Sequence, residues 1–443
     1  MLASTVLFLS VQISKGEDIS SIFTSGKTIS DGWRSIDFFG HYFPFSSGWL
    51  YHLEHGWIYS RAESLDSIWY WHQTNKWCWT TQGIYPWIWF HEEQSWMMFL
   101  QDSGKYQVDS LYLISKQGCG RATAYSNANK IISAKRKTHV SWIDSPSEGF
   151  RVRVATFDKK TRKWSPTYTV GEAKDNHGGP ALTIDSEGYL HIAYFPHVGS
   201  FCYRRSKYPY DVSEWEQEIK FGERLTYPSM ICGVDNTLYL TARRSVKDQP
   251  SYVELWEKKL GQNWYCVGPV MHSRYKGYAH FGESLTWGPD QKTIHLSCRF
   301  HEKSDKKAYG RLQTVGYMKS EDFGRTWKRS DGSLIEQPIT VDTIETIAHG
   351  GVDFNKTLRA GCMAVSPTGN PYVIYSTATN ETMNLGSSRE KGETWLRIAD
   401  MKGSWDRICL NDYLPTEWKS FNLTMPGGIS FDEMGRLHGV CTL

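Results

Sequence analysis

The 443-residue sequence lacks features that define several common classes of protein. No apolar run approaches the ~18 residues of a membrane-spanning helix, so we expect no membrane span. The nine cysteines contain no Cys-x-x-Cys pair, which signals neither a zinc ribbon nor a disulfide framework. The formal net charge is only +3 and no basic stripe is visible, which argues against nucleic acid as a partner.

The N-terminus also offers little. Residues 6–9 (Val-Leu-Phe-Leu) are apolar, but the run is short and lacks both a basic segment before it and a clear small-residue cleavage site. Residues 1–30 therefore receive no domain assignment. The expected location, secreted or periplasmic, rests on this weak signal alone.

Tryptophan, by contrast, is abundant. Ten of the 20 tryptophans lie between Trp33 and Trp96, in short alternating aromatic segments such as 48–52 and 56–59. This spacing predicts a small antiparallel β-meander over residues 31–110. Two roles fit its aromatic side chains, because flat rings stack on sugars and also fill the cores of β-proteins.

A longer repeat of strand, turn and strand occupies the rest of the chain. Its first clear copies begin about 50 residues apart, and helical periodicity is almost absent, which is typical of a β-propeller. The copies lie at 181–194, 229–242, 284–298, 362–375 and 429–440, with a weaker one near 128–142. We therefore expect an all-β fold in which residues 111–443 form a propeller, with seven blades if residues 427–443 pair with strands near 108–116.

Two short motifs support the propeller. Residues 320–327 match the Asp-box pattern Ser-x-Asp-x-Gly-x-Thr-Trp in full, and residues 388–395 match it with Glu390 in place of the aspartate. In such a turn the acid binds backbone N–H groups, the glycine takes a positive φ and the tryptophan packs beneath. These motifs mark a fold and carry no chemistry.

Candidate catalytic side chains concentrate between residues 175 and 244. His177, His197, Tyr227 and Arg243 each lie at the end of a predicted strand, where a β-scaffold usually places its chemistry. A purely structural role is the alternative for His177, which precedes Gly-Gly-Pro and could cap a turn.

Local geometry refines two of these positions. Tyr227 precedes Pro228, which predicts extended backbone at the tyrosine. Arg243 and Arg244 point to opposite faces of a strand, so only one of them can reach a shared pocket.

This region resembles a known family. His177, residues 203–206 and 211–215, Tyr227-Pro228 and Arg243, followed by Asp boxes, resemble the BNR-repeat propellers that include ulvan lyases. The resemblance covers roughly residues 115–443. It implies a seven-bladed propeller that cleaves a polysaccharide of sulfated rhamnose and uronic acid by β-elimination. It also implies that His177 and Tyr227 are catalytic, that Arg243 neutralises the uronate carboxylate and that His197 lines the pocket.

The chemistry of elimination fits these residue types. A guanidinium binds a carboxylate bidentately and keeps its charge, which suits Arg243 to acidify the adjacent C5–H. A neutral histidine exchanges protons near neutral pH, which suits His177 as base or base partner. Tyr227 is expected to protonate the leaving O4, and it remains an alternative base. The scheme needs no metal.

Further residues are candidates for binding the substrate. They are Arg204, Tyr278, His280 and Arg299, the last as a second clamp for carboxylate or sulfate. A structural zinc is a weaker alternative. Its potential ligands, Cys266, His280, Cys298 and His301, lie close in sequence, although their spacing fits no recognised pattern.

Three functions remain open at this point. The first is a lyase acting, as a monomer, on an acidic polysaccharide. The second is a glycoside hydrolase on the same propeller, with rhamnosidases as the nearer model, because the residue set of a sialidase cannot be assembled here. The third is a propeller that binds glycans without catalysis, since fold kinship alone does not fix a reaction.

Overall fold

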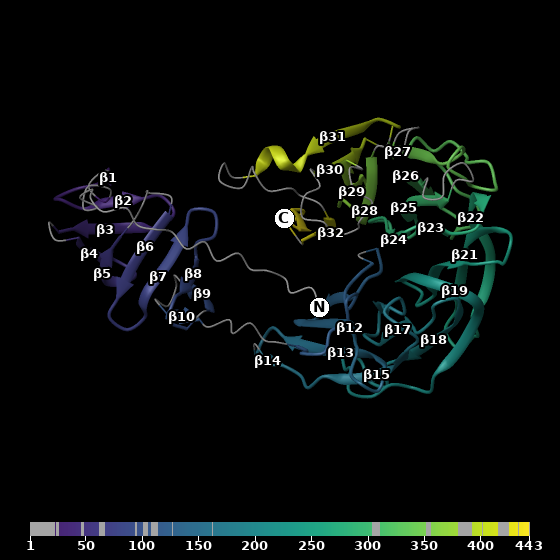
Figure 1. The fold of residues 1–443 in the computed structure, drawn as a ribbon, viewed down its shortest axis with the longest axis horizontal. Coiled ribbons are helices and arrows are strands. Elements are labelled where there is room, and N and C mark those ends of the chain that lie inside the picture. Colours follow the sequence, from purple (N-terminus) through teal and green to yellow (C-terminus); the bar gives the residue numbers. More distant parts are fainter. Residues whose placement is uncertain are drawn as a thin grey trace. The chain divides into compact units, whose positions relative to one another are not determined.

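The computed structural model describes residues 23, 26–45, 48–61, 67–93, 95–100, 105–107, 114–125, 127–161, 163–303, 311–350, 356–379, 392–400, 402–414, 425–432 and 434–442. The chain divides into two compact units, residues 1–113 (unit 1) and 114–443 (unit 2). Both are built from antiparallel strands (Figure 1).

Unit 1 contains one ten-stranded sheet in which each strand pairs with the next along the chain. This is the predicted meander. Its strands are β1 (Lys27–Thr28), β2 (Arg34–Ile36), β3 (Gly40–Pro44), β4 (Trp49–His52), β5 (Gly56–Ser60), β6 (Ser67–His72), β7 (Lys76–Thr81), β8 (Trp87–Phe90), β9 (Ser95–Leu100) and β10 (Lys105–Gln107).

The two faces of this sheet differ because side chains alternate along each strand. On β5, for example, Ile58 is buried while Trp57 is 52% exposed. The core consists of Phe23, Ile36, Phe39, Tyr42, Leu50, Ile58, Ile68, Tyr70, Cys78, Ile88, Phe90, Met97 and Phe99. No tryptophan belongs to it in the described part of unit 1. The tryptophan rings instead pack against one another on the opposite face, as Trp79 and Trp96 do at 5.9 Å between centroids.

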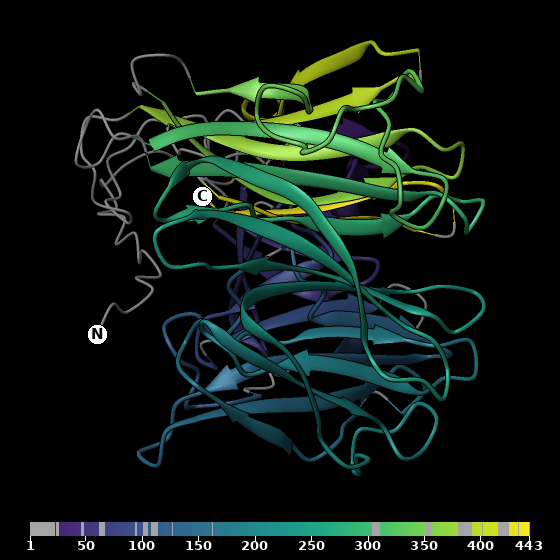
Figure 2. The same cartoon turned by 90° about the vertical axis from the view of Figure 1, so that its right-hand side faces the viewer.

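The strands of unit 2 form five sheets, which follow one another in chain order from blue to yellow in Figures 1 and 2. The first contains β11 (Ile131–Ala134), β12 (Lys137–Asp144), β13 (Phe150–Asp158), β14 (Lys163–Trp164) and β15 (Tyr168–Ala173). The second contains β16 (Ala181–Ile184), β17 (Leu190–Tyr194), β18 (Gly199–Arg205), β19 (Ile219–Cys232), β20 (Leu238–Arg244), β21 (Pro250–Lys258) and β22 (Tyr265–Lys276).

The remaining three sheets of unit 2 contain five, four and two strands. The third contains β23 (Ala279–His280), β24 (Ser284–Trp287), β25 (Ile294–Lys303), β26 (Arg311–Ser320) and β27 (Glu345–His349). The fourth contains β28 (Lys356–Val365), β29 (Pro371–Thr379), β30 (Gly392–Ala399) and β31 (Trp405–Cys409), and the fifth contains β32 (Met425–Phe431) and β33 (Leu437–Thr442). A short 3-10 helix, η1 (Leu410–Tyr413), follows β31.

The all-β prediction is therefore confirmed. In the described residues, no helix is long and apolar enough to cross a membrane. The apolar run 6–9 and most of the segment 108–116, which was expected to close the propeller, lie outside the described residues.

The long strand β19 joins two parts of its sheet. Its first half pairs with β18 and its second half with β20, and the pairing with β20 shifts by one residue between Thr226 and Pro228. Tyr227 is the residue left over at this bulge, and its φ is 62°. The prediction of extended backbone at Tyr227 is thus wrong, because the bulge overrides the preference that the following proline imposes.

The Asp box at residues 320–327 has the predicted geometry. Asp322 Oδ1 accepts from the backbone N–H groups of Arg325 and Thr326, at 3.1 and 2.9 Å. Gly324 has a φ of 87°, and Trp327 is fully buried. Of the second box, residues 388–391 lie outside the described residues.

Candidate functional site

The four predicted residues gather where several strands of unit 2 end. His177 lies just before β16, His197 lies between β17 and β18, Tyr227 occupies the bulge of β19 and Arg243 lies near the end of β20. The register of β19 with β20 pairs Thr226 with Arg243, which brings the tyrosine and the arginine together. The spatial convergence that the sequence suggested is therefore present.

A carboxylate that the sequence analysis did not single out joins the two histidines. Asp175 Oδ1 lies 3.0 Å from Nδ1 of His177, and Asp175 Oδ2 lies 2.7 Å from Nδ1 of His197. The two imidazole rings stack at 4.1 Å between centroids. Because an ionised carboxylate only accepts hydrogen bonds, Nδ1 of each histidine carries the proton and Nε2 is left as the basic nitrogen.

The charges around Asp175 stabilise this arrangement. Burial alone would raise the pKa of Asp175, but hydrogen bonds from His177 and His197 lower it overall. Partial burial lowers the pKa of His177, and the nearby Arg121 charge lowers it further, against the opposing effect of the bond to Asp175. His177 is therefore neutral near pH 7 and able to accept a proton.

Arg121 is a second residue that the sequence analysis missed. Its Nη1 contacts Nε2 of His177 and also donates to the hydroxyl of Tyr125 at 3.0 Å. Both residues lie in the described segment 114–125, which precedes the first strand of unit 2. No motif of the sequence marks this segment, so only the fold brings it to the site.

Tyr227 is buried among other rings. Its ring centroid lies 4.7 Å from that of Tyr125 and 4.5 Å from that of His280. Burial raises the pKa of Tyr227 well above its ordinary value, and the phenols of Tyr278 and Tyr125 raise it further, although the Arg243 charge opposes them. In the free protein Tyr227 is therefore a protonated phenol, which suits a proton donor better than a base.

Arg243 lies beneath this ring with little exposed surface. It is only 2% exposed, its Nη1 donates to the carbonyl of Ala279 at 3.0 Å, and its guanidinium lies 4.7 Å from the Tyr227 ring centroid. Arg244 points to the other face of β20 and pairs with Glu254 at 3.0 Å. The predicted division between the two arginines is confirmed.

Besides His197, three of the four further residues predicted to bind substrate lie beside this group. Tyr278 is 50% exposed, and the Arg243 guanidinium lies 5.4 Å from its ring centroid. Arg299 donates to the carbonyl of Leu358 at 3.0 Å and approaches Nδ1 of His280 at 3.3 Å. Burial lowers the pKa of His280 well below its ordinary value, and the charges of Arg299 and Arg243 add to this.

The position of Arg204 does not support the role predicted for it. Its charge acts on Tyr194 and Cys202, which lie in β17 and β18. In the described part of the chain, it forms no hydrogen bond, ion pair or ring contact with His177, Tyr227 or Arg243. The strand pairing explains this, because Arg204 lies opposite Ile192 near the last residue of β18, whereas His197 lies in the turn before the first residue of that strand.

The backbone around the site is strained. Tyr125, Phe195, Val198 and Tyr227 all have positive φ, between 59° and 95°. Such values are unusual for residues other than glycine and cluster at functional sites. Gly178 serves the same region by its small size, because a Cβ there would lie 2.5 Å from the carbonyl oxygen of Phe195.

Two buried charged groups lie close to these residues. Glu283 is fully buried, and neither carboxylate oxygen has a hydrogen-bond partner among the described residues; burial raises its pKa to about 8, against the Arg243 charge. Lys130 donates to the carbonyls of Tyr125 and Ala128 at 2.9 and 3.2 Å, and burial lowers its pKa to about 7. Lys130 thereby fixes the segment that carries Tyr125.

The potential metal ligands do not form the group considered for zinc. Among the described residues, two sets of three side chains have ligand atoms within 4.8 Å of one another, and they are His52, Glu54 and His55 in unit 1 and Asp175, His177 and His197 in unit 2. Neither set contains any of the four residues considered for zinc, which are Cys266, His280, Cys298 and His301. The Arg121 guanidinium against His177 disfavours a cation at the second set, which we interpret as a hydrogen-bonded group.

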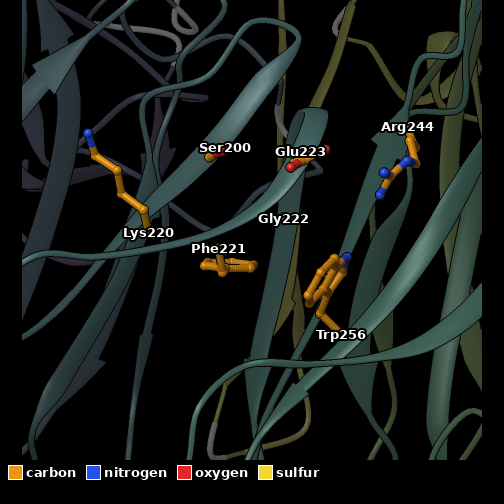
Figure 3. Close-up of a pocket in the computed structure, with 7 residues that line it drawn as sticks. All are labelled: Ser200, Lys220, Phe221, Gly222, Glu223, Arg244 and Trp256. Atoms are coloured by element: carbon orange, nitrogen blue, oxygen red, sulfur yellow. The ribbon is translucent and has the colours of Figure 1, made fainter.

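A hollow of about 390 Å³ lies on the other side of the same strands (Figure 3). It is lined in part by Phe221, Glu223, Arg244 and Trp256, and Lys220 lies at its rim in the view. The hollow contains Arg244 and not Arg243. It is therefore separate from the histidine group, and no residue predicted for the site lines it.

The site therefore brings three chemically distinct groups next to one another. They are a neutral histidine with one basic nitrogen, a protonated phenol and a buried guanidinium. These are the groups that abstract a proton, donate a proton and neutralise a carboxylate.

Comparison with known proteins places this site in a family. A family model described as "BNR repeat-containing family member" matches residues 125–413. The ulvan lyase of Nonlabens ulvanivorans is 24% identical over 288 residues, which are 55% of this chain and 60% of that protein. The ulvan lyase of Alteromonas sp. (strain LOR) is 29% identical over 334 residues, 65% of this chain and 66% of that protein. The matches thus span less than two thirds of these relatives.

Solved structures share the fold. A PL25 ulvan lyase bound to -[GlcA(1-4)Rha3S]- superposes with a TM-score of 0.58 at 18% identity, covering 71% of this chain and 76% of that chain. The sheets, the Asp-box turn and the family match over more than half of the chain show that this protein belongs to the BNR repeat-containing family.

Proposed function

We propose that unit 2 is the catalytic part of a polysaccharide lyase that cleaves a uronate-containing, ulvan-like polysaccharide by β-elimination. The observation that carries the proposal is the convergence of the Asp175–His177–His197 group with Tyr227 and Arg243. The names of the two curated relatives support the same reaction. Such a polymer is too large to enter a cell, so we extend the proposal to a secreted or periplasmic protein. We also propose that it acts as a monomer.

The proposed reaction balances without a metal or cofactor. Arg243 binds the uronate carboxylate and spreads the negative charge that develops when C5–H is broken. Nε2 of His177 takes the C5 proton, the C4–O4 bond breaks, a C4=C5 double bond forms and the phenol of Tyr227 protonates the departing O4. His197 and Asp175 hold His177 in the required tautomer and orientation.

The assignment of base and acid follows from the surroundings of the two groups. The pKa of His177 is lowered, so its ring is neutral near pH 7, whereas the pKa of Tyr227 is raised, so its phenol is protonated. Pairs of groups whose pKa values are pushed apart in this way commonly serve as base and acid. We therefore assign the base to His177 and the acid to Tyr227.

The proposal includes the architecture of unit 2. We propose that each of the sheets β11–β15, β23–β27 and β28–β31 is one propeller blade and that β16–β22 comprises two blades joined through β19. The shift in pairing at Tyr227 supports this division. This division accounts for five blades, and β32–β33 would be part of a sixth. The seventh blade and the closure of the ring remain part of the proposal.

A panel of uronate-containing algal and plant polysaccharides tests the function. Incubation with ulvan should produce oligosaccharides with unsaturated uronate at their new non-reducing ends, detected by NMR and mass spectrometry. New reducing ends without unsaturation would instead indicate a hydrolase. Binding without any cleavage of the panel would indicate a glycan-binding propeller.

A further inference from the structure

His177 has a single nitrogen with which it can act as a base, and that nitrogen is covered. Nδ1 is held by Asp175 at 3.0 Å, so only Nε2 can accept a proton from a substrate. Nη1 of Arg121 contacts Nε2. A guanidinium stays charged and only donates, so Arg121 occupies the lone pair that elimination requires.

Arg121 differs from the other arginines of the site in how it is held. Arg243 and Arg299 each donate to a backbone carbonyl, and Arg243 is almost fully buried. Arg121 is exposed and is held only by the side chains of His177 and Tyr125 in the described part of the chain. An exposed side chain with such partners can move at low cost, because an exposed contact of this kind contributes about 1 kcal/mol or less.

We propose that Arg121 couples recognition of an anion to release of the base. In the free protein Arg121 covers Nε2 of His177; an anionic group on a sugar next to the cleaved uronate draws the guanidinium away and frees Nε2. This inference rests on the proposed lyase function. Arg121 keeps all its protons throughout, exchanging the imidazole nitrogen for an anionic oxygen, and Nε2 then takes the C5 proton.

The chemistry of the arginine defines the anion. A guanidinium pairs bidentately with planar or tetrahedral oxyanions, so a sulfate ester and a second carboxylate share the chemistry that Arg121 recognises. The role would make Arg121 a specificity-determining residue, since a sugar without the anion would leave the base covered. Substrates without such a group would then react slowly even where they fit.

Nuclear magnetic resonance of the His177 ring tests the contact without relying on turnover. The charged or titratable groups that face this ring are Asp175 and His197, Arg121 and Tyr125, and Tyr227. Because the Arg121 charge lowers the pKa of His177, Arg121→Gln should raise it. Inorganic sulfate, and acetate as the carboxylate probe, should raise the pKa in the wild-type protein and leave it unchanged in Arg121→Gln.

A matched control is Arg136→Gln, which removes an exposed arginine from the turn between β11 and β12. It should leave the His177 titration and its response to both anions as in the wild type. An unchanged His177 pKa in Arg121→Gln, or the same anion response with and without Arg121, would overturn the proposal. Either result would leave the lyase function untouched.

Turnover of matched oligosaccharides provides the second readout. For sulfated over desulfated oligosaccharides, the ratio of kcat/KM should fall about tenfold in Arg121→Gln, the change expected from losing about 1.4 kcal/mol of discrimination. Activity on the desulfated oligosaccharide should rise, because Nε2 is no longer covered, and Arg121→Lys should retain part of the preference. Equal losses on both oligosaccharides would contradict the proposal. The anion would be the carboxylate rather than the sulfate if desulfation leaves kcat/KM of the wild-type protein unchanged, while reduction of the neighbouring carboxylate lowers it.

Discussion

Two histidine groups of similar composition occur in this protein, one in each unit, and they differ in what their nitrogens contact. In unit 1, Nε2 of His52 lies 2.6 Å from the carbonyl of Phe39, and Nδ1 accepts from the backbone N–H groups of Glu54 and His55 at 3.1 and 3.2 Å. His72 accepts similarly from the backbone of Thr74 and Asn75. The rings of His52 and His72 thus hold hairpin turns together, whereas Nε2 of His55 lies 3.4 Å from the hydroxyl of Tyr85.

In unit 2 the partners are side chains from separate segments. His177 contacts Asp175 and Arg121, and His197 shares Asp175. Backbone partners stabilise a local turn, whereas side-chain partners that can change protonation or position suit chemistry. The comparison shows why a set of three potential ligands is a weak sign of function until the partner of each nitrogen is known.

The largest effect is expected from removing one hydroxyl in unit 2. Tyr227→Phe should lower kcat by at least 10²–10⁴-fold, roughly the contribution of a positioned proton donor, while binding of substrate is spared. Tyr42→Phe is the matched change in unit 1, where the hydroxyl donates to the carbonyl of Phe23 at 2.9 Å. It should cost about 1 kcal/mol of stability and leave kcat unchanged. A fully active Tyr227→Phe variant would remove this residue from the mechanism.

The acidic members of the two groups should also differ. Asp175→Asn leaves an amide where both histidines need an acceptor, so kcat should fall about 10²-fold or more. Glu54→Gln, at an exposed position of the unit 1 group, should leave kcat unchanged. Steady-state kinetics on both variants checks this. Equal kcat values for the two variants would contradict the catalytic role of the unit 2 group.

Neighbouring arginines on β20 provide a comparison within unit 2. Arg243→Ala should weaken binding of uronate oligosaccharides by about 2–5 kcal/mol, because a desolvated charge pair is lost. Arg244→Ala should leave affinity intact, since Arg244 pairs with Glu254 on the other face of the strand. Calorimetric titration of inactive Tyr227→Phe protein carrying either change measures the difference. A similar loss of affinity in both variants would contradict the assignment of Arg243 alone to the site.

The pH dependence of the free energy of unfolding provides a further test of the histidine group in unit 1. Burial lowers the pKa of His52 from 6.5 to about 4. Above pH 6.5 the ring is neutral in both the folded and unfolded states; as the pH falls from 6.5 to 4 the unfolded state binds the proton first, so stability is lost. His52 alone should lower the free energy of unfolding of unit 1 by about 3 kcal/mol over this window, and His55, whose pKa burial also lowers, should add to the loss. Urea unfolding of the full chain, followed by tryptophan fluorescence, should show a loss in His52→Asn protein that is smaller than in the wild type by the contribution of His52.

Regular features of this protein could be predicted from sequence because they depend on local patterns. Alternation predicted the β-meander and the opposite faces of Arg243 and Arg244, and the Asp box at 320–327 predicted its own turn. The histidines, Tyr227 and Arg243 could be chosen because residues suited to the chemistry followed predicted strands.

What could not be predicted depends on long-range packing. Arg121 and Tyr125 reach the site from a segment without any motif, and Asp175 was not singled out, because its bond to His197 becomes visible only in the fold. The positive φ of Tyr227 comes from a register shift between two strands, which no local rule reveals. The position of Arg204 could not be predicted for the same reason, because it depends on the pairing of β17 with β18.

The most direct test follows the ultraviolet absorbance of the C4=C5-unsaturated uronate while the full-length protein acts on ulvan. We expect the absorbance to rise steadily with wild-type protein, in step with new chain ends, and to change very little with Tyr227→Phe. New chain ends that accumulate without absorbance, or an equal rise with the variant, would contradict this expectation.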